Sequence, residues 1–146
     1  MMGEFEAEFP TDRQYALNHM WALPSPEGYR FGFSAYAVRL LQDVYFLDWY
    51  FDAPATVQFQ QEIGAIESKK AESSLYSPID GLLTAFNPQL MADPSGVNVD
   101  KYGQGWLFEI TPTDAKADEL LSPDAYLEHL EQVWKITQRT IKGQLN

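Results

Sequence analysis

The sequence contains no cysteine and only two histidines among its 146 residues. A chain without cysteine forms no disulfide and offers no thiol, so any redox chemistry must reside on a cofactor. The histidines, His19 and His129, form no His-Glu-x-x-His pattern, and no metal site is recognisable. We interpret His19, beside Trp21, as a hydrogen-bonded cleft or core residue, and we expect His129 to be exposed on a helix.

Basic residues are also scarce. Ten Lys and Arg stand against twenty-one Asp and Glu, which gives a formal net charge of −11. Such a surface repels phosphate backbones and anionic lipids, so it argues against nucleic-acid and membrane partners. A protein with a basic docking face would be attracted instead, and less strongly at high salt.

Long hydrophobic runs are absent as well, and no apolar stretch approaches membrane-spanning length. The acidic N-terminus lacks the basic segment and apolar stretch of a secretory signal. The simplest interpretation is a cytoplasmic protein, although a mature organellar protein without its transit peptide fits equally well.

The chain does contain apolar patterning typical of strands. Its length suits a single domain, 1–146. We expect residues 1–12 to be an acidic lead-in. Strands are expected at 13–23, 29–33, 43–51, 57–67, 74–79, 82–86 and 106–111. A short internal helix over 35–41 begins at the cap Ser34, and a C-terminal helix over 122–142 begins at the cap Ser122.

Two connections are also predicted. Asp80-Gly81 indicates a tight hairpin turn with Gly81 at positive φ, and residues 87–105, rich in Pro, Asn, Asp and Gly, indicate a long loop. The five aromatic residues within 45–51 are interpreted as sheet core, with Tyr50 or Phe51 facing a partner. The fold class is therefore mainly β with two helices.

The polar segment 68–72 (Ser-Lys-Lys-Ala-Glu) has hairpin size and lies between two apolar-patterned strands. An enzyme that modifies a lysine needs it on a protruding, well-defined backbone, and a hairpin tip provides this. The alternative is that Lys69 and Lys70 are two solvated charges at a turn, because short motifs also match by chance.

The wider chain resembles the glycine cleavage H protein family from about Phe9 to Leu130. The segments that carry the resemblance are 9–10 (Phe-Pro) with Tyr15, 19–21 (His-Met-Trp), 32–37 (Gly-Phe-Ser-Ala-Tyr-Ala), 41–44 (Leu-Gln-Asp-Val), 67–71 (Glu-Ser-Lys-Lys-Ala), 75–78 (Leu-Tyr-Ser-Pro), 97–98 (Val-Asn) and 102–107 (Tyr-Gly-Gln-Gly-Trp-Leu). Several motifs in the same order are far more specific than any one of them.

The resemblance implies a lipoyl-domain-like barrel-sandwich hybrid of two antiparallel sheets. It also implies that lipoate is joined by an amide to Lys70, the lysine three positions after Glu67. Lys69 occupies a position where the family usually has valine, and the Met-Lys-Met context of biotin carriers is absent. Lysine plus lipoate would reach about 14 Å from the backbone, judged from ordinary bond lengths.

The resemblance further implies a cleft for this arm near His19, Met20 and Ser74. Met20 stands where the family has the glutamate of its His-Glu-Trp triplet, and Ser74 where it often has an acidic residue. Methionine lines an apolar, polarizable pocket but does not neutralise an amine. These differences indicate either drift within a working H protein or a paralogue whose arm carries another load.

The function implied is that of a non-catalytic carrier that shuttles an aminomethyl group and electrons. Its partners would be glycine decarboxylase, aminomethyltransferase and dihydrolipoamide dehydrogenase, with lipoate ligase to attach the cofactor. Three alternatives stay open: an H-like lipoate-binding protein serving a heterodisulfide-reductase-like sulfur-oxidation complex, a lipoate-relay protein, and an unmodified interaction module. Met20 and Ser74 are the residues that favour the first alternative.

Overall fold

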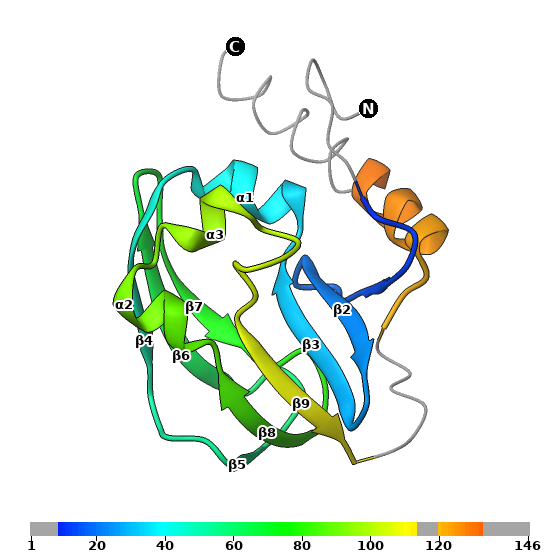
Figure 1. The fold of residues 1–146 in the computed structure, drawn as a ribbon. Helices are drawn as coiled ribbons and strands as arrows, with labels where there is room; N and C mark the ends of the chain where they lie inside the picture. The colour runs from blue at the N-terminus through cyan, green and yellow to red at the C-terminus, as the bar shows by residue number, and fades with distance from the viewer. Residues whose placement is uncertain (1–8, 114–119, 133–146) are drawn as a thin grey trace.

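A computed structural model describes residues 9–113 and 120–132 (Figure 1). Its elements are β1 (Gln14–Tyr15), β2 (Met20–Ser25), β3 (Gly28–Phe33), α1 (Ala35–Leu41), β4 (Val44–Trp49), β5 (Ala55–Val57), β6 (Glu62–Ser68), β7 (Glu72–Tyr76), β8 (Gly81–Phe86), α2 (Pro88–Ala92), α3 (Gly96–Val99) and β9 (Phe108–Pro112). A further helix covers residues 123–132. In this part of the chain, no helix is long and apolar enough to cross a membrane.

The strands form two antiparallel sheets, as predicted. The larger sheet has the order β1-β2-β3-β9-β8-β5, and the smaller has the order β4-β6-β7. Strand side chains alternate between the two faces of a sheet, so each sheet turns one apolar face inward. Phe31, Leu83 and Phe108 of the larger sheet and Ile63 of the smaller are fully buried in the resulting core.

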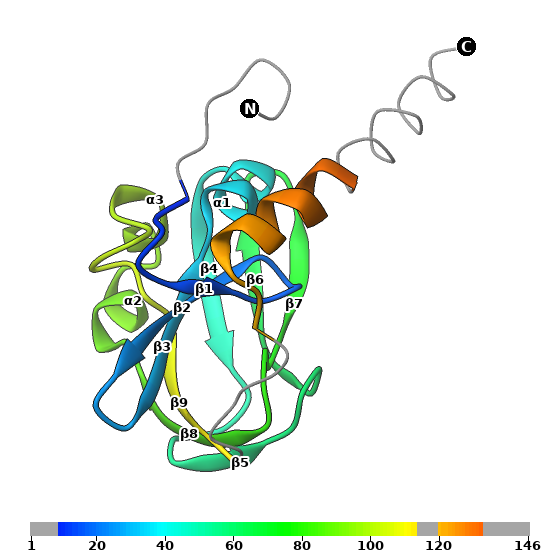
Figure 2. The same cartoon turned by 90° about the vertical axis from the view of Figure 1, so that its right-hand side faces the viewer.

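Figure 2 shows the C-terminal helix over residues 123–132 beside β1, and a second, aromatic cluster packs between this helix and β1, β2 and α1. The ring of Tyr126 stacks on Tyr15, with centroids 4.6 Å apart and planes at 3°, and Trp21, Tyr36 and Leu130 complete the buried set. The helix predicted over 122–142 is confirmed for residues 123–132, and its remainder lies outside the described residues. Residues 1–8 of the predicted lead-in also lie outside them.

The internal helix agrees with its prediction, because α1 covers residues 35–41 and the Ser34 side chain accepts a hydrogen bond from the N–H of Ala37. The single strands predicted over 13–23 and 57–67 are wrong, since each is two strands separated by a tight turn. His19 in the first turn has φ 69°, and Gln60 in the second has φ 67°. Apolar residues flank both turns, so hydrophobic alternation alone does not locate them.

Residues 87–105 are not the long loop that composition predicts. They contain two short helices, α2 and α3. Asn87 begins α2 by accepting a hydrogen bond from the N–H of Gln89, and Pro88 occupies the first helical turn, where its missing N–H costs nothing. Helices of four or five residues lack a full amphipathic repeat, which explains why periodicity does not reveal them.

The hairpin predicted at Asp80-Gly81 is wrong. Strands β7 and β8 belong to different sheets, so residues 77–80 form a crossover rather than a hairpin turn. Gly81 is the first residue of β8, and its φ lies outside the positive range. Glycine is required there for another reason: a Cβ would lie 2.3 Å from the carbonyl oxygen of Thr111 on the paired strand β9.

The aromatic segment 45–51 is only partly core. Trp49 and Phe51 pack against the main core as predicted, whereas Tyr45, Phe46 and Tyr50 are exposed by 62%, 45% and 49%. The pairing of β4 with β6 contains an irregularity between Val44 and Phe46. A bulge of this kind shifts the alternation by one residue, and it turns Phe46 outward.

Candidate functional site

The β6–β7 hairpin presents Lys70 at its tip, where both Lys69 and Lys70 are exposed. The backbone of this tip is closely constrained by Ser68, which is only 4% exposed. The N–H of Ser68 donates to the carbonyl oxygen of Ala71 at 2.8 Å. The Ser68 hydroxyl accepts from the N–H groups of Lys70 and Ala71 at 3.4 and 3.2 Å, and it donates to the Ala71 carbonyl.

A second connection fixes the tip to the rest of the molecule. The N–H of Lys69 donates to the carbonyl oxygen of Asp43, just before β4, at 2.8 Å. That region is itself held by Asn98, whose side chain accepts from the N–H of Val44 at 2.9 Å and donates to the carbonyl of Gln42 at 2.6 Å. Lys70 therefore projects from a rigid root, as its predicted role requires.

A cleft of about 330 Å³ opens beside the tip, between α1, the start of β2 and the free edge of β7. We call it the β7 cleft. It brings together all three residues predicted for the arm cleft, His19, Met20 and Ser74, and it begins at Ala71, the neighbour of Lys70. Its other lining residues are Asn18, Phe33, Ala37, Leu40, Leu41, Ile66, Ser73, Leu75 and Tyr76.

The lining of the β7 cleft contains no Asp, Glu, Lys or Arg. Its one titratable base, His19, is neutral at physiological pH, because burial, followed by the charge of His129, lowers its pKa from 6.5 to about 4. Met20 is 1% exposed, and its sulfur lies 3.6 Å from the side-chain nitrogen of Asn18. The cleft is therefore shaped for an uncharged, largely apolar group.

His19 also joins the β7 cleft to the C-terminal helix. Its Nδ1 lies 3.0 Å from the hydroxyl oxygen of Tyr126, which lies 3.0 Å from the hydroxyl of Ser34. The interpretation of His19 as a hydrogen-bonded cleft residue is confirmed. The expected exposure of His129 is wrong: it is half-buried, with its ring 6.1 Å from that of His19.

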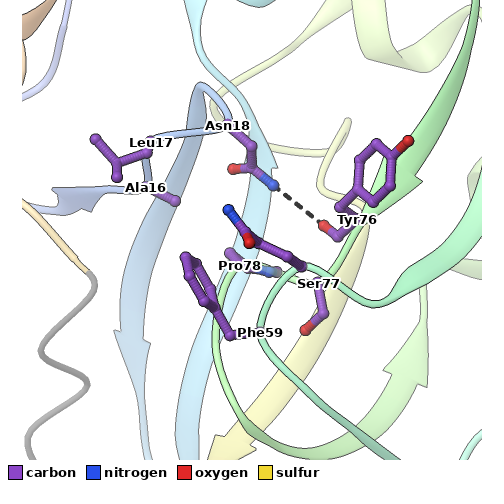
Figure 3. A pocket seen from close by; sticks show the side chains of 8 residues that line it. Ala16, Leu17, Asn18, Phe59, Tyr76, Ser77 and Pro78 are labelled. Carbon is purple, nitrogen blue, oxygen red and sulfur yellow. Dashed lines mark hydrogen bonds between the residues drawn. The ribbon is translucent and has the colours of Figure 1, made fainter.

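Asn18 lines both the β7 cleft and a second hollow of about 410 Å³, which is the one drawn in Figure 3. Its side-chain nitrogen donates to the backbone carbonyl of Tyr76 at 3.1 Å, while its buried side-chain oxygen has no partner among the described residues. The hollow is lined by Ala16, Leu17, Asn18, Phe59, Gln60, Tyr76, Ser77 and Pro78. Sequence reasoning missed Asn18, and its position next to His19 was the one available signal.

The chain is similar to known proteins over most of its length. A family model described as glycine cleavage H-protein matches residues 13–133. The glycine cleavage system H protein of Pseudoalteromonas atlantica is 38% identical over 128 residues, which cover 86% of this chain and 98% of that protein. The H protein of Thermus thermophilus is 35% identical over 125 residues, which cover 85% and 97%.

A solved structure agrees with these similarities. The crystal structure of a glycine cleavage system H protein from Mycobacterium marinum superposes with a TM-score of 0.73 at 32% identity, covering 84% of this chain and 99% of that one. The fold predicted from the resemblance, a lipoyl-domain-like sandwich of two antiparallel sheets, is thereby confirmed.

Proposed function

The chain belongs to the glycine cleavage H-protein family, and on that premise we propose that it carries lipoate as an amide on Lys70. It acts as a lipoyl carrier in glycine cleavage. The observation that carries the assignment to Lys70 is the hairpin tip, because its backbone is fixed at Ser68 and at Lys69 while the Lys70 side chain is exposed.

The residues around Lys70 fit the cofactor. The lysine must be accessible to an attaching enzyme, and the tip satisfies this. The modified side chain must also have a place to rest, and the β7 cleft begins one residue away, at Ala71. An extended strand rises about 3.4 Å per residue, so an arm of about 14 Å spans roughly the length of β7. The far end of the cleft lies at Asn18 and Tyr76.

Lipoate, when attached, supplies a disulfide that accepts electrons and a substrate fragment. The chain itself has other tasks. Met20, Phe33 and Leu75 provide an apolar wall that excludes water, and neutral His19 adds a polar edge without a charge. The protein is a carrier whose residues hold and present the arm, and it performs no bond chemistry of its own.

The partners follow from the same premise. They are glycine decarboxylase, aminomethyltransferase and dihydrolipoamide dehydrogenase, with lipoate ligase for attachment, and the compartment is the cytoplasm. The relatives reported above are all named as glycine cleavage H proteins. Nothing among them favours the sulfur-oxidation alternative, for which the substitutions at Met20 and Ser74 were the only support.

Lipoylation of Lys70 is tested by intact mass after incubation with lipoate, ATP and lipoate ligase. The wild type should gain one lipoyl group. Lys70→Arg should gain none, while Lys69→Arg is the matched control and should be modified normally. A Lys70→Arg protein that still gains a lipoyl group would refute the assignment.

A further inference from the structure

The side of the β4-β6-β7 sheet that faces away from the core forms a continuous surface, which we call the outer face. Its first row, next to the Lys70 tip, is Phe46, Glu67 and Glu72, which are paired across the three strands. Asp48, Ala65 and Ser74 form the second row, and Ser74, on the edge strand β7, also lies at the rim of the β7 cleft.

The third row of the outer face is aromatic and acidic. Glu62 pairs with Tyr76, and Tyr50 follows β4 at the same end of the sheet. The N–H of Tyr50 donates to the carbonyl oxygen of Ile63, the residue after Glu62, at 3.1 Å. Partial desolvation, followed by the carboxylates of Glu62 and Asp48, raises the pKa of Tyr50. Rows on one face are two residues apart, so the three rows extend about 14 Å from the tip.

Exposed aromatic side chains are concentrated on this sheet. In the ranges 9–113 and 120–132, the exposed large aromatic residues are Tyr45, Phe46, Tyr50 and Tyr76, and all four belong to β4, to β7 or to the residue after β4. Aromatic residues are enriched in protein interfaces, where they contribute a large contact area at a small cost in side-chain entropy. Exposed aliphatic side chains such as Met91 and Leu82 are scattered over other elements.

The arrangement of acidic residues on the outer face lowers the stability of the isolated protein. Glu67 lies directly opposite Glu72 on neighbouring strands, and like charges in this position destabilise a sheet. The tip that joins these two strands carries Lys69 and Lys70, whose positive charges lower the net negative charge of this end of the sheet before modification. An amide on Lys70 removes that positive charge, so the modified tip has two neighbouring carboxylates with only Lys69 nearby.

We propose that the outer face docks the enzyme that loads the arm, through a partner surface that carries Arg or Lys side chains around an apolar recess. This proposal rests on the proposed function. A partner that acts at the tip must cover a surface continuous with it, and the outer face starts at the tip. The partner's cations would take the position that the Lys70 charge vacates, and its recess would accept Phe46.

The test uses the full-length, fully lipoylated carrier, verified by intact mass, with pyridoxal-dependent glycine decarboxylase as the probe. The glycine–bicarbonate exchange rate is measured against carrier concentration. Phe46→Ser should raise KM about tenfold, the effect of losing one well-buried interface aromatic, and leave kcat unchanged. Glu62→Gln combined with Glu72→Gln should raise KM at low salt and make KM less dependent on salt. This pair leaves residues 67–71 around the attachment lysine unchanged.

Matched controls show whether the change in KM depends on the outer face or on surface hydrophobicity and net charge in general. Met91→Ser removes an exposed apolar side chain from α2. Glu27→Gln combined with Glu128→Gln changes the net charge by the same two units on other elements. Both should retain the wild-type KM, and no variant should have a lower melting temperature than the wild type.

Two outcomes would count against these ideas and are distinguishable. If the wild type supports exchange but Phe46→Ser and the double glutamine variant keep its KM, docking lies elsewhere and this proposal is wrong. If the lipoylated wild type supports no exchange at any concentration, the proposed function fails and this proposal fails with it.

Discussion

The Nδ1 atom of His19 and the hydroxyl oxygen of Tyr126 lie 3.0 Å apart, so that a residue lining the β7 cleft is bound to a residue of the C-terminal helix. Both groups are largely buried, and burial, followed by the charge of His129, lowers the pKa of His19 to about 4. Burial at this position therefore favours the neutral imidazole.

This relationship predicts a pH dependence of stability. The unfolded chain takes up a proton near pH 6.5, while the folded chain resists protonation down to about pH 4. The unfolded state then binds more protons between these values, so stability is complete above pH 6.5 and falls as the pH is lowered to 4. Between pH 7.5 and pH 4.5 the His19 contribution to this loss is about 2.5 kcal/mol.

The measurement is the free energy of unfolding by denaturant at pH 7.5 and at pH 4.5. His19→Asn keeps a residue that tolerates positive φ, and it should reduce the difference in unfolding free energy between the two pH values by about 2.5 kcal/mol. Carboxylates titrate equally in both proteins and cancel. An identical difference in wild type and variant would show that His19 is not the titrating group.

A second prediction concerns charge in the β7 cleft. The wild-type lining has no carboxylate, so a cationic aminomethyl load is poorly held there. Met20→Glu combined with Ser74→Asp should lengthen the lifetime of the loaded carrier several-fold, because an ion pair between the load and a carboxylate at half-buried position 74 contributes about 1 kcal/mol. The rate of spontaneous release from the isolated, loaded carrier measures this.

Met20→Gln combined with Ser74→Asn is the matched neutral control for that pair. It supplies polar side chains of similar size without charge, and it should release its load at the wild-type rate. If the acidic and neutral pairs have equal lifetimes, charge in the cleft does not govern retention of the load.

Gly81→Val is predicted to lower the free energy of unfolding by about 1 to 3 kcal/mol, as overpacked core substitutions do. The cause is the close approach of β8 to β9, where a Cβ would lie 2.3 Å from the carbonyl oxygen of Thr111 and 2.7 Å from a methyl group of Ile110. Leu82→Val, at an exposed position of the same strand, should change stability little. A denaturation midpoint of Gly81→Val equal to that of wild type would contradict this explanation.

Ser68→Ala should weaken the hairpin tip. The hydroxyl accepts from two backbone N–H groups and is buried, so its loss leaves those groups less well satisfied and costs about 1 to 2 kcal/mol of stability. Ser73→Ala is the control, because the Ser73 hydroxyl is exposed and bonds only to the Ser74 carbonyl at 3.3 Å. Thermal denaturation of the two variants should differ clearly, and equal melting temperatures would argue against the role assigned to Ser68.

The sequence alone was sufficient to predict those parts of the fold that depend on residues close together in the chain. Ser34 begins α1 where its side chain predicts, and the hairpin around Lys70 follows from polar residues between two apolar strands. The exposure of Phe46 could not be predicted in this way, since it depends on a bulge that is defined only by pairing with β6. Gly81 likewise requires knowledge of β9, thirty residues later in the chain.

The site shows the same division. Lys70 is proposed as the attachment residue from its own segment together with the resemblance, because attachment needs one accessible lysine. The wall of the β7 cleft comes from α1, β2 and β7, and its contact with Tyr126 spans 107 positions of sequence. The hydrophobic pattern of a single segment does not predict such an assembly. For this reason sequence reasoning missed Asn18, whose side chain bonds to the Tyr76 carbonyl at the end of the cleft away from the tip.

The fixed backbone beneath Lys70 has a geometric consequence for every enzyme that uses the arm. Because Lys69 is bonded to the Asp43 carbonyl and Ser68 closes the turn, the base of the arm does not advance toward a partner. The depth of a partner's active site below the surface that contacts the tip is then limited to about 14 Å, the length of the modified side chain. A deeper site would have to open its own entrance, and the enzymes that use the arm should therefore have channels of similar depth.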